Sequence, residues 1–258
     1  MLRVIRPFVF PALLLAALEW YARTLGQGSD AIAPPSKAAQ AFVAALWSTG
    51  EFSVLQATAF TLGSAGAGLL LGLVAGVGLG VVLGLSRRAA QMSYLSVEVL
   101  RPVPSVALIP LAMLVFGFGF RMEISVVAFA TFWPLLLLTQ AAVQQVEPRL
   151  LEVARALNLS PLERAFKIVL PSVLPRLFVA LRLGVAIALV VAVTVEIAAN
   201  PSGMGYALMI AQQSLQPELM LAWLFWIGLV GYVINSAALL LQRWVARRMG
   251  ETAGGPGQ

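Results

Sequence analysis

Few residue types in this chain can carry out covalent chemistry. The chain has no histidine and no cysteine, and Asp30 is its only aspartate. Histidine is the commonest general base and metal ligand, and cysteine supplies thiolate ligands and disulfides. A catalytic cluster is therefore hard to assemble, and a membrane-embedded enzyme is the weakest of the three function classes that we compare.

Charged residues gather instead in one segment, residues 151–175, which reads LEVARALNLSPLERAFKIVLPSVLP. Only 11% of the chain is charged, yet this segment contains Glu152, Arg155, Glu163, Arg164 and Lys167. Polar groups in this pattern suit either a connector that rests on lipid headgroups or a docking element for another protein. The segment is not basic enough for a dedicated lipid-surface helix.

Helix start and stop signals divide this segment into two short helices. Pro148 begins the first, and Asn158 is expected to end it in the left-handed conformation. Ser160 and Glu163 form a capping box for the second helix. Pro171 is expected to stop that helix, because the residue before a proline avoids the α region. The sequence thus predicts two short helices joined by a tight corner.

The rest of the chain is suited to lipid. Of its 258 residues 60% are hydrophobic, and the mean hydropathy is +0.91. Long apolar runs without alternation predict helices rather than a β-barrel, because backbone groups in a bilayer must be satisfied internally. The fold class predicted is an all-α integral membrane protein with about six transmembrane helices. These spans are expected at 6–24, 54–85, 99–119, 122–145, 174–198 and 219–243.

Basic residues give the orientation. The net charge of +6 is scattered over the ends of apolar runs, which does not resemble a nucleic-acid-binding stripe. With the N-terminus inside, fourteen of the 17 Lys and Arg residues lie on the inner side. We therefore expect a multi-pass membrane protein with both termini in the cytoplasm. The expected divisions are 1–53 (first span and an outer amphipathic helix starting at 34–36), 54–248 (core, with a cytoplasmic loop at 146–173) and a disordered tail at 249–258.

A regular stripe of small residues marks the second predicted span. Glycine recurs at every fourth position, at Gly68, Gly72, Gly76, Gly80 and Gly84. Small residues at this spacing allow another helix to pack closely. The partner helix could belong to this chain or to another one.

Two further features bear on a path through the membrane. Pro102, Pro104 and Ser105 interrupt the start of the third predicted span, and a broken helix at membrane depth is tolerated only where it is buried or lines a cavity. These residues either border a path or form a simple kink. Glu196 lies near the outer end of the fifth span. Either this side chain has a functional role, as ionisable groups inside a membrane usually do, or it simply reaches interfacial water.

The charged segment resembles the EAA motif of binding-protein-dependent ABC importer permeases. That motif reads Glu-Ala-Ala, three residues, Gly, nine residues, Ile-x-Leu-Pro. Matching positions here are Glu152, Ala154, Ile168, Leu170 and Pro171, whereas Val153 replaces an alanine and Asn158 replaces the glycine. Residues 100–120 and 196–208 are similar to the nitrate/sulfonate/taurine branch of that family, and the resemblance covers most of residues 30–248.

The resemblance implies a type I importer fold, a permease dimer (a homodimer is expected), a cytoplasmic ATPase subunit at each EAA loop and an extracytoplasmic solute-binding protein. The implied ATPase contacts are Glu152, Ala154, Arg155, Leu157, Asn158, Leu159 and Ser160, while Ile168 and Pro171 set the return of the loop to the next span. No cofactor is expected on this chain. It lacks the phosphate-binding pattern G-x-x-x-x-G-K-[ST] and has only two lysines, so ATP and Mg²⁺ would be bound by the partner ATPase.

The main alternative is a secondary transporter of a small solute. That class predicts ionisable residues deep in several spans and internal repeats, whereas the sequence offers candidates only near span ends. The resemblance fits sulfonates, taurine, nitrate or a similar solute. The residues themselves do not identify the substrate, because no arginine is clearly placed in mid-membrane.

Overall fold

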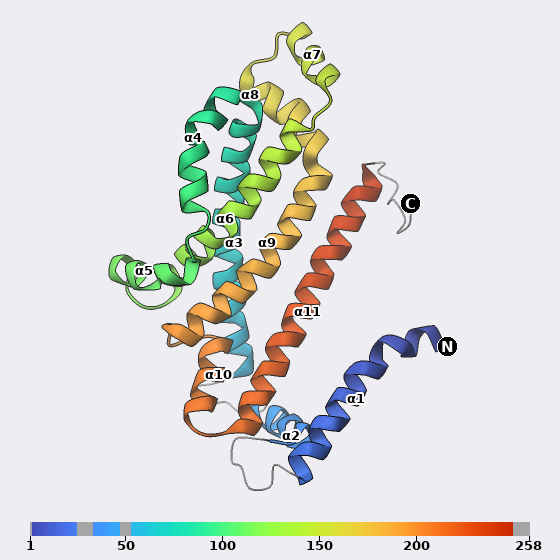
Figure 1. Ribbon diagram of the computed structural model, residues 1–258, viewed down its shortest axis with the longest axis vertical. Helices are drawn as coiled ribbons and strands as arrows, with labels where there is room; N and C mark the ends of the chain where they lie inside the picture. Colours follow the sequence, from blue (N-terminus) through green and yellow to red (C-terminus); the bar gives the residue numbers. More distant parts are fainter. Residues whose placement is uncertain (1, 25–32, 47–52, 250–258) are drawn as a thin grey trace. The chain divides into compact units, whose positions relative to one another are not determined.

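The computed structural model describes residues 2–24, 33–46 and 53–249, and all regular structure in them is helical (Figure 1). The α-helices are α1 Leu2–Thr24, α2 Pro35–Leu46, α3 Val54–Leu85, α4 Arg87–Leu100, α5 Ile109–Phe116, α6 Phe120–Gln144, α7 Pro148–Ala156, α8 Pro161–Arg164, α9 Leu170–Ala198, α10 Met204–Gln213 and α11 Pro217–Arg248. A 3₁₀ turn, η1 Ser105–Leu108, precedes α5, and a π-helical turn, η2 Ala165–Val169, joins α8 to α9. The predicted all-α class is confirmed.

Among the described residues, four continuous helices are long and apolar enough to cross a membrane: Val54–Leu85, Phe120–Gln144, Pro161–Ala198 and Pro217–Arg248. A fifth span is possible if the bent pair Arg87–Leu100 and Ser105–Phe116 counts as one. The first predicted span is helical within α1 but is not among these helices, and its first side chains lie outside the described residues. The predicted tail at 249–258 lies almost entirely outside them as well.

The chain divides into two compact units. Unit 1 comprises Met1–Thr61 and Glu196–Val230, and unit 2 comprises Leu62–Val195 and Gly231–Gln258. The divisions fall inside α3, near the end of α9 and within α11. Each unit is described by itself below.

The glycine stripe of α3 packs against α6 in unit 2. A Cβ added at Gly76 would lie 2.8 Å from the Phe132 carbonyl oxygen, and one added at Gly80 would lie 2.7 Å from the Leu136 carbonyl oxygen. The residues of α6 that meet the stripe also recur every fourth position: Val127, Thr131, Leu135, Thr139 and Val143. The partner helix, which the sequence left open, is therefore α6 of the same chain.

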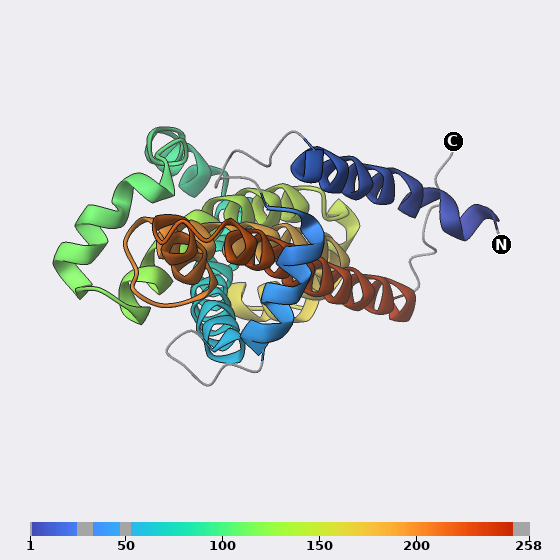
Figure 2. The ribbon, with the colours of Figure 1, turned by 90° about the horizontal axis from the view of Figure 1, so that it is seen from below.

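The third predicted span differs from its expected form. Ser86 caps α4 directly after α3 ends, its hydroxyl accepting the Ala89 N–H at 3.2 Å, so residues 87–100 form a helix that was not predicted from the sequence. This helix ends at Leu100, and the chain resumes at Ser105 with a bend of 83°. Pro102 and Pro104 fall in this break, as predicted, and the predicted span 99–119 comprises the end of α4, the break, η1 and α5. Both views place the bent pair at the edge of unit 2 (Figures 1 and 2).

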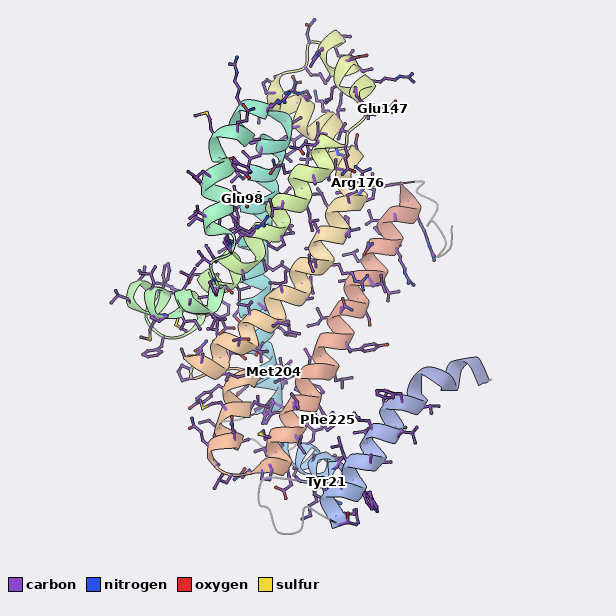
Figure 3. All side chains as sticks on the ribbon, viewed as in Figure 1. Tyr21, Glu98, Glu147, Arg176, Met204 and Phe225 are labelled. Atoms are coloured by element: carbon purple, nitrogen blue, oxygen red, sulfur yellow. The ribbon has the colours of Figure 1, made fainter. Side chains whose placement is uncertain are left out.

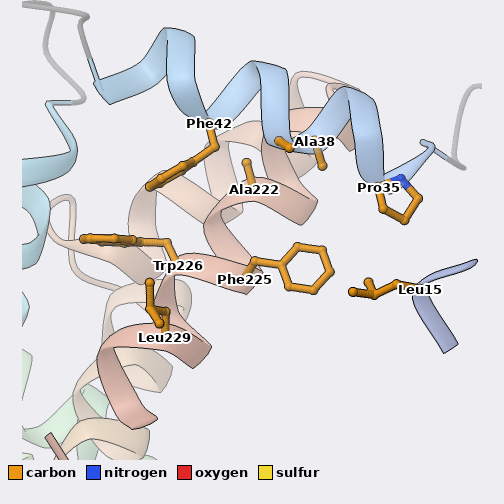
Figure 4. Close-up of a pocket in the computed structure, with 9 residues that line it drawn as sticks. Leu15, Pro35, Ala38, Phe42, Ala222, Phe225, Trp226 and Leu229 are labelled. Carbon is orange, nitrogen blue, oxygen red and sulfur yellow. The ribbon is translucent and has the colours of Figure 1, made fainter. Parts of the chain in front are cut away.

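In unit 1, α1, α2 and α11 enclose an apolar pocket of about 320 Å³ (Figure 4). Phe42 of α2 lies against Trp226 of α11 with ring centroids 5.1 Å apart. Trp226 donates its indole N–H to the Thr58 hydroxyl at 2.8 Å. Glu19 of α1 accepts the backbone N–H of Ser36 at 2.9 Å and thereby fixes the first turn of α2. The helix predicted after residues 34–36 is confirmed.

Candidate functional site

The corner between α7 and α8, residues 157–160, is a complete helix-ending motif. Asn158 has a φ of 51°, so the predicted left-handed cap is confirmed. The N–H of Leu159 donates to the Ala154 carbonyl at 3.0 Å, and the N–H of Asn158 donates to the Arg155 carbonyl at 2.9 Å. These two bonds define a Schellman motif, in which the left-handed residue lets the last carbonyls of the helix find partners. The corner has one defined backbone shape.

The capping box that starts the next helix is also confirmed. The Ser160 hydroxyl accepts the Glu163 N–H at 3.3 Å, and the Glu163 carboxylate accepts the Ser160 N–H at 3.1 Å. Lys167 donates to the other Glu163 oxygen at 2.7 Å. Glu163 is in the first turn of the continuous helix 161–198, ahead of its apolar part. The Lys167 hydrogen bond first, and then the N–H and hydroxyl of Ser160, lower the pKa of Glu163 to about 2.

The helix that begins at Ser160 does not stop at Pro171, so that prediction is wrong. Leu170 has ordinary α-helical angles, and its N–H donates to the carbonyl of Ala165, five residues back. Proline lacks an N–H and crowds the preceding turn, and a wider π turn can accommodate it without ending the helix. The Ser172 hydroxyl donates to the Ile168 carbonyl at 2.6 Å and so satisfies one of the carbonyls near the proline. The corner is therefore joined to one helix of 38 residues, Pro161–Ala198.

Most of the predicted contact residues lie on the surface of this corner. Glu152, Arg155, Leu157, Asn158 and Ser160 are exposed, and Leu159 is half-buried. Ala154 is only 1% exposed and cannot take part in a surface contact in this structure. Its carbonyl closes the Schellman motif, so its small side chain lies on the inner side of α7.

The predicted contact residues include only part of the apolar surface here. Leu157, which was predicted, is 64% exposed, and Leu162 and Phe166, which were not, are 72% and 67% exposed. Val153, which replaces an alanine of the EAA motif, is also exposed. Figure 1 shows α7 at one end of unit 2, beyond the ends of α3 and α6. Exposed apolar side chains close together at the tip of a domain are typical of an interaction surface.

Beneath this corner, unit 2 has a packed core that holds the loop to the spans. It joins α3, α6, η2 and α9 through Val81, Ala142, Val143, Val146, Ala165, Val169, Val173 and Leu177. Ile168 is half-buried beside this core, and Pro171 is exposed.

Glu196 lies in unit 1 and is fully buried, so it does not reach interfacial water. Its carboxylate accepts the Thr61 hydroxyl at 2.6 Å and the Gly205 N–H at 2.8 Å, and the Met204 N–H donates to the same hydroxyl at 3.0 Å. Gly203 has a φ of 94°, and a Cβ there would overlap the Glu196 carboxylate. In unit 1 this acid holds the turn before α10 against the first turns of α3.

The break between α4 and α5 borders a pocket of about 370 Å³ in unit 2, beside α6 and α9. Ser105 lines it, as do Arg101 and Val103 from the break itself. Pro102 and Pro104 are not among its lining residues, and neither is Glu196. Of the four residues predicted for a path, the structure thus brings only Ser105 to this pocket.

Comparison with known proteins gives the family. Residues 68–251 match the family described as "Binding-protein-dependent transport system inner membrane component". The chain belongs to this family. The permease is 34% identical over 176 residues to the putative aliphatic sulfonates transport permease protein SsuC of Bacillus subtilis, across 68% of this chain and 64% of that protein. It is 29% identical to the bicarbonate transport system permease protein CmpB of Synechococcus elongatus, across 70% of this chain and 66% of that one.

The fold of the permease is also known from solved structures. It superposes on a chain of the MetNI methionine ABC transporter, in an inward-facing conformation, with a TM-score of 0.66 and 18% identity. The match covers 80% of the permease and 96% of that chain. This likeness shows the fold of an ABC importer permease.

Two intramembrane polar contacts of the permease were not predicted from sequence. Glu123, in the first turn of α6, is fully buried and accepts the Ser64 hydroxyl of α3. Arg182 of α9 donates to the Asn235 side chain of α11 at 3.3 Å. Sequence reasoning could have found Glu123, because an acid one turn into an apolar span is rare. In the part of the chain that the structure describes, no group of three or more His, Cys, Asp or Glu side chains could hold a metal ion.

Proposed function

We propose that this chain is the membrane-spanning subunit of an ATP-driven importer, coupled to a separate ATPase through the α7 corner. The corner residues, 157–160, carry this proposal. They combine a fixed backbone shape with the exposed side chain of Leu157, and Leu162 and Phe166, which follow the corner, are exposed as well. A rigid tip with uncovered apolar side chains is suited to insertion into a groove of another protein.

The distribution of basic residues supports a cytoplasmic position for this corner. Apart from Arg101 and Arg182, which lie within the spans, twelve of the 17 Lys and Arg residues fall on one side when the N-terminus is inside, and the corner lies on that side. A cytoplasmic ATPase can reach it there. Both termini of the chain would also be cytoplasmic.

Division of labour between subunits follows from the residues. The chain has no phosphate-binding loop motif and two lysines in total, so ATP and Mg²⁺ would be held by the partner ATPase. A binding protein outside the membrane would deliver the solute, and a second copy of the permease would complete the path. The relatives' names indicate small anions such as sulfonates or bicarbonate as the cargo class, and nitrate and taurine fit the same branch.

The helix that follows the corner would transmit the motion. Because Pro161–Ala198 is continuous through η2, a displacement of the corner moves the span without passing through a flexible loop. ATP binds the two states of the ATPase pair with different affinities, and it can therefore shift the population from an inward-open to an outward-open path.

Replacement of Leu157 by Arg tests the coupling. The charge should release the ATPase during co-purification and abolish ATP-dependent uptake, while the chain still inserts into the membrane. Arg88→Ser, at the exposed start of α4, is the matched control and should keep both properties. Normal co-purification and normal uptake by Leu157→Arg would overturn the docking role of the corner.

A further inference from the structure

The break between α4 and α5 lies at membrane depth. The 14 residues of α4 run back along α3 for about 21 Å from its end at Leu85 (Figure 1). The 32 residues of α3 span about 48 Å, which exceeds the bilayer core of about 30 Å by about 18 Å. Even if all of this excess protruded at the α4 side, the break would still lie within the hydrocarbon core. Arg101 is therefore an intramembrane arginine.

Irregular backbone at this depth needs a cavity or protein around it. The pocket of about 370 Å³ described above provides one, and it is within the size range of small-molecule sites. Its polar edge is formed by Arg101 and Ser105, and its walls are aromatic and apolar, including Phe129, Pro134 and Ile187. A few polar groups against an apolar wall are typical of a site that orients a small solute.

One lining residue has an unmet hydrogen-bonding requirement. Trp133 is 9% exposed, and its indole N–H has no hydrogen-bond acceptor among the described residues. The ring is held edge-to-face by Phe129 and Phe132, with centroids 5.6 Å and 4.8 Å away. An indole N–H can only donate, and a buried donor without a partner is costly. The indole nitrogen has almost no accessible surface in this structure, so the polar groups that the pocket offers a solute are the Arg101 guanidinium and the Ser105 hydroxyl. Apart from that hydroxyl, which can also accept, the lining side chains carry no acceptor.

Resting on the importer function proposed above, we propose that this pocket is a transit site for a small monoanion, whose oxyanion head is held by Arg101 with Ser105 as a further donor. Guanidinium groups match the geometry of planar and tetrahedral oxyanions and stay charged at all physiological pH values. The apolar wall then accommodates the remainder of the anion.

A carboxylate of the permease competes weakly with the anion for Arg101, so a bound anion can be released. A carboxylate oxygen of Glu98, which Figure 3 labels on α4, lies 3.6 Å from a guanidinium nitrogen of Arg101. This separation is longer than that of a charge-assisted hydrogen bond, so the two side chains are not tightly paired. An entering anion can replace Glu98 as the partner of Arg101, and Glu98 can take its place when the anion leaves. A transit site needs this balance, because tight binding would slow passage.

Anion binding to the purified permease tests the pocket directly. The probes are the sodium salts of nitrate, bicarbonate and methanesulfonate, each compared with sodium chloride at equal ionic strength in thermal unfolding. At least one should raise the unfolding temperature of the wild type. Arg101→Gln and Ser105→Ala should each raise the anion concentration needed for that stabilisation by about tenfold or more. Glu98→Gln should lower the anion concentration needed for stabilisation, because the carboxylate that competes for Arg101 is removed.

Arg88→Gln removes the same charge at the other end of α4 and is the matched control, expected to leave the concentration dependence unchanged. Ser105→Ala keeps the pocket testable if Arg101→Gln does not fold. The proposal fails if no probe stabilises the wild type above chloride, or if Arg101→Gln responds like the wild type.

Uptake by the complete importer separates this proposal from the importer function itself. If wild type and Arg101→Gln transport an anion equally well, the pocket assignment is wrong and the importer function stands. If the wild-type complex shows no ATP-dependent uptake of any solute delivered by its binding protein, the importer function is wrong. Loss of uptake in Arg101→Gln with retained ATPase co-purification supports the pocket.

Discussion

Replacement of Gly76 by alanine tests the packing of α3 on α6 most sharply. The added Cβ would lie 2.8 Å from the Phe132 carbonyl oxygen and 3.0 Å from the Leu135 Cβ. Non-bonded heavy atoms make comfortable contacts from about 3.5 Å outward. The added Cβ would therefore lie about 0.7 Å too close to a backbone carbonyl oxygen, which no rotamer change can move. The two helices must separate locally. Overpacking of this kind costs about 1–3 kcal/mol.

Gly78→Ala provides the matched control on the same helix. Nothing lies within 4 Å of a Cβ at Gly78. Alanine is favoured over glycine in a helix by about 1 kcal/mol, and both variants gain this amount. Their difference in stability therefore isolates the packing cost, and Gly76→Ala should be the less stable by about 1–3 kcal/mol.

Thermal unfolding of the purified permease in detergent, followed by tryptophan fluorescence, measures this difference. The expected order of unfolding temperature is Gly78→Ala at or above the wild type, with Gly76→Ala clearly below Gly78→Ala. Equal unfolding temperatures for the two variants would refute the close approach of α3 and α6 at the stripe.

Three further predictions concern single residues. Gly203→Ala should destabilise the turn before α10 because its φ is 94° and its Cβ would meet the Glu196 carboxylate, and faster hydrogen exchange at 203–205 would show it; unchanged exchange would contradict this geometry. Asn158→Gly should preserve ATPase binding and Asn158→Val should weaken it, because a β-branched residue resists the left-handed conformation; identical binding would remove the cap argument. Because the pKa of Glu163 is lowered from 4.5 to about 2, its stabilisation of the α8 start should be present above pH 4.5 and fade as the pH falls toward about 2. Exchange protection of the Ser160, Glu163 and Arg164 amides should follow that decline in the wild type, whereas Glu163→Gln should show no such pH dependence. A pH-independent wild type would contradict the assignment.

The sequence was sufficient where the structure depends on local chemistry. Asn158 and the Ser160–Glu163 capping box act within a few residues, and both were predicted correctly. Pro171 was misjudged because its local preference against helix is outweighed by a π turn within a packed helix. Here Ala165 and Val169 lie buried in the core of unit 2.

Features that depend on tertiary contacts were not accessible from sequence. Ala154 looks like a surface residue of the EAA motif, but it is buried on the inner side of α7. Leu162 and Phe166 were not predicted as contacts, because helical periodicity cannot say which apolar face a neighbour covers. The pocket beside Arg101 exists only because α4 doubles back along α3 and brings the break next to α6 and α9.

The docking of an ATPase at the α7 corner is tested most directly by protection of a single cysteine. The chain has no native cysteine, so Leu157→Cys carries the only thiol, on a side chain that is 64% exposed. A membrane-impermeant maleimide should label it in inside-out vesicles stripped of the ATPase, and adding back the ATPase subunit should block the labelling. Equal labelling with and without the ATPase, or labelling only from the outer side of the membrane, would contradict the account.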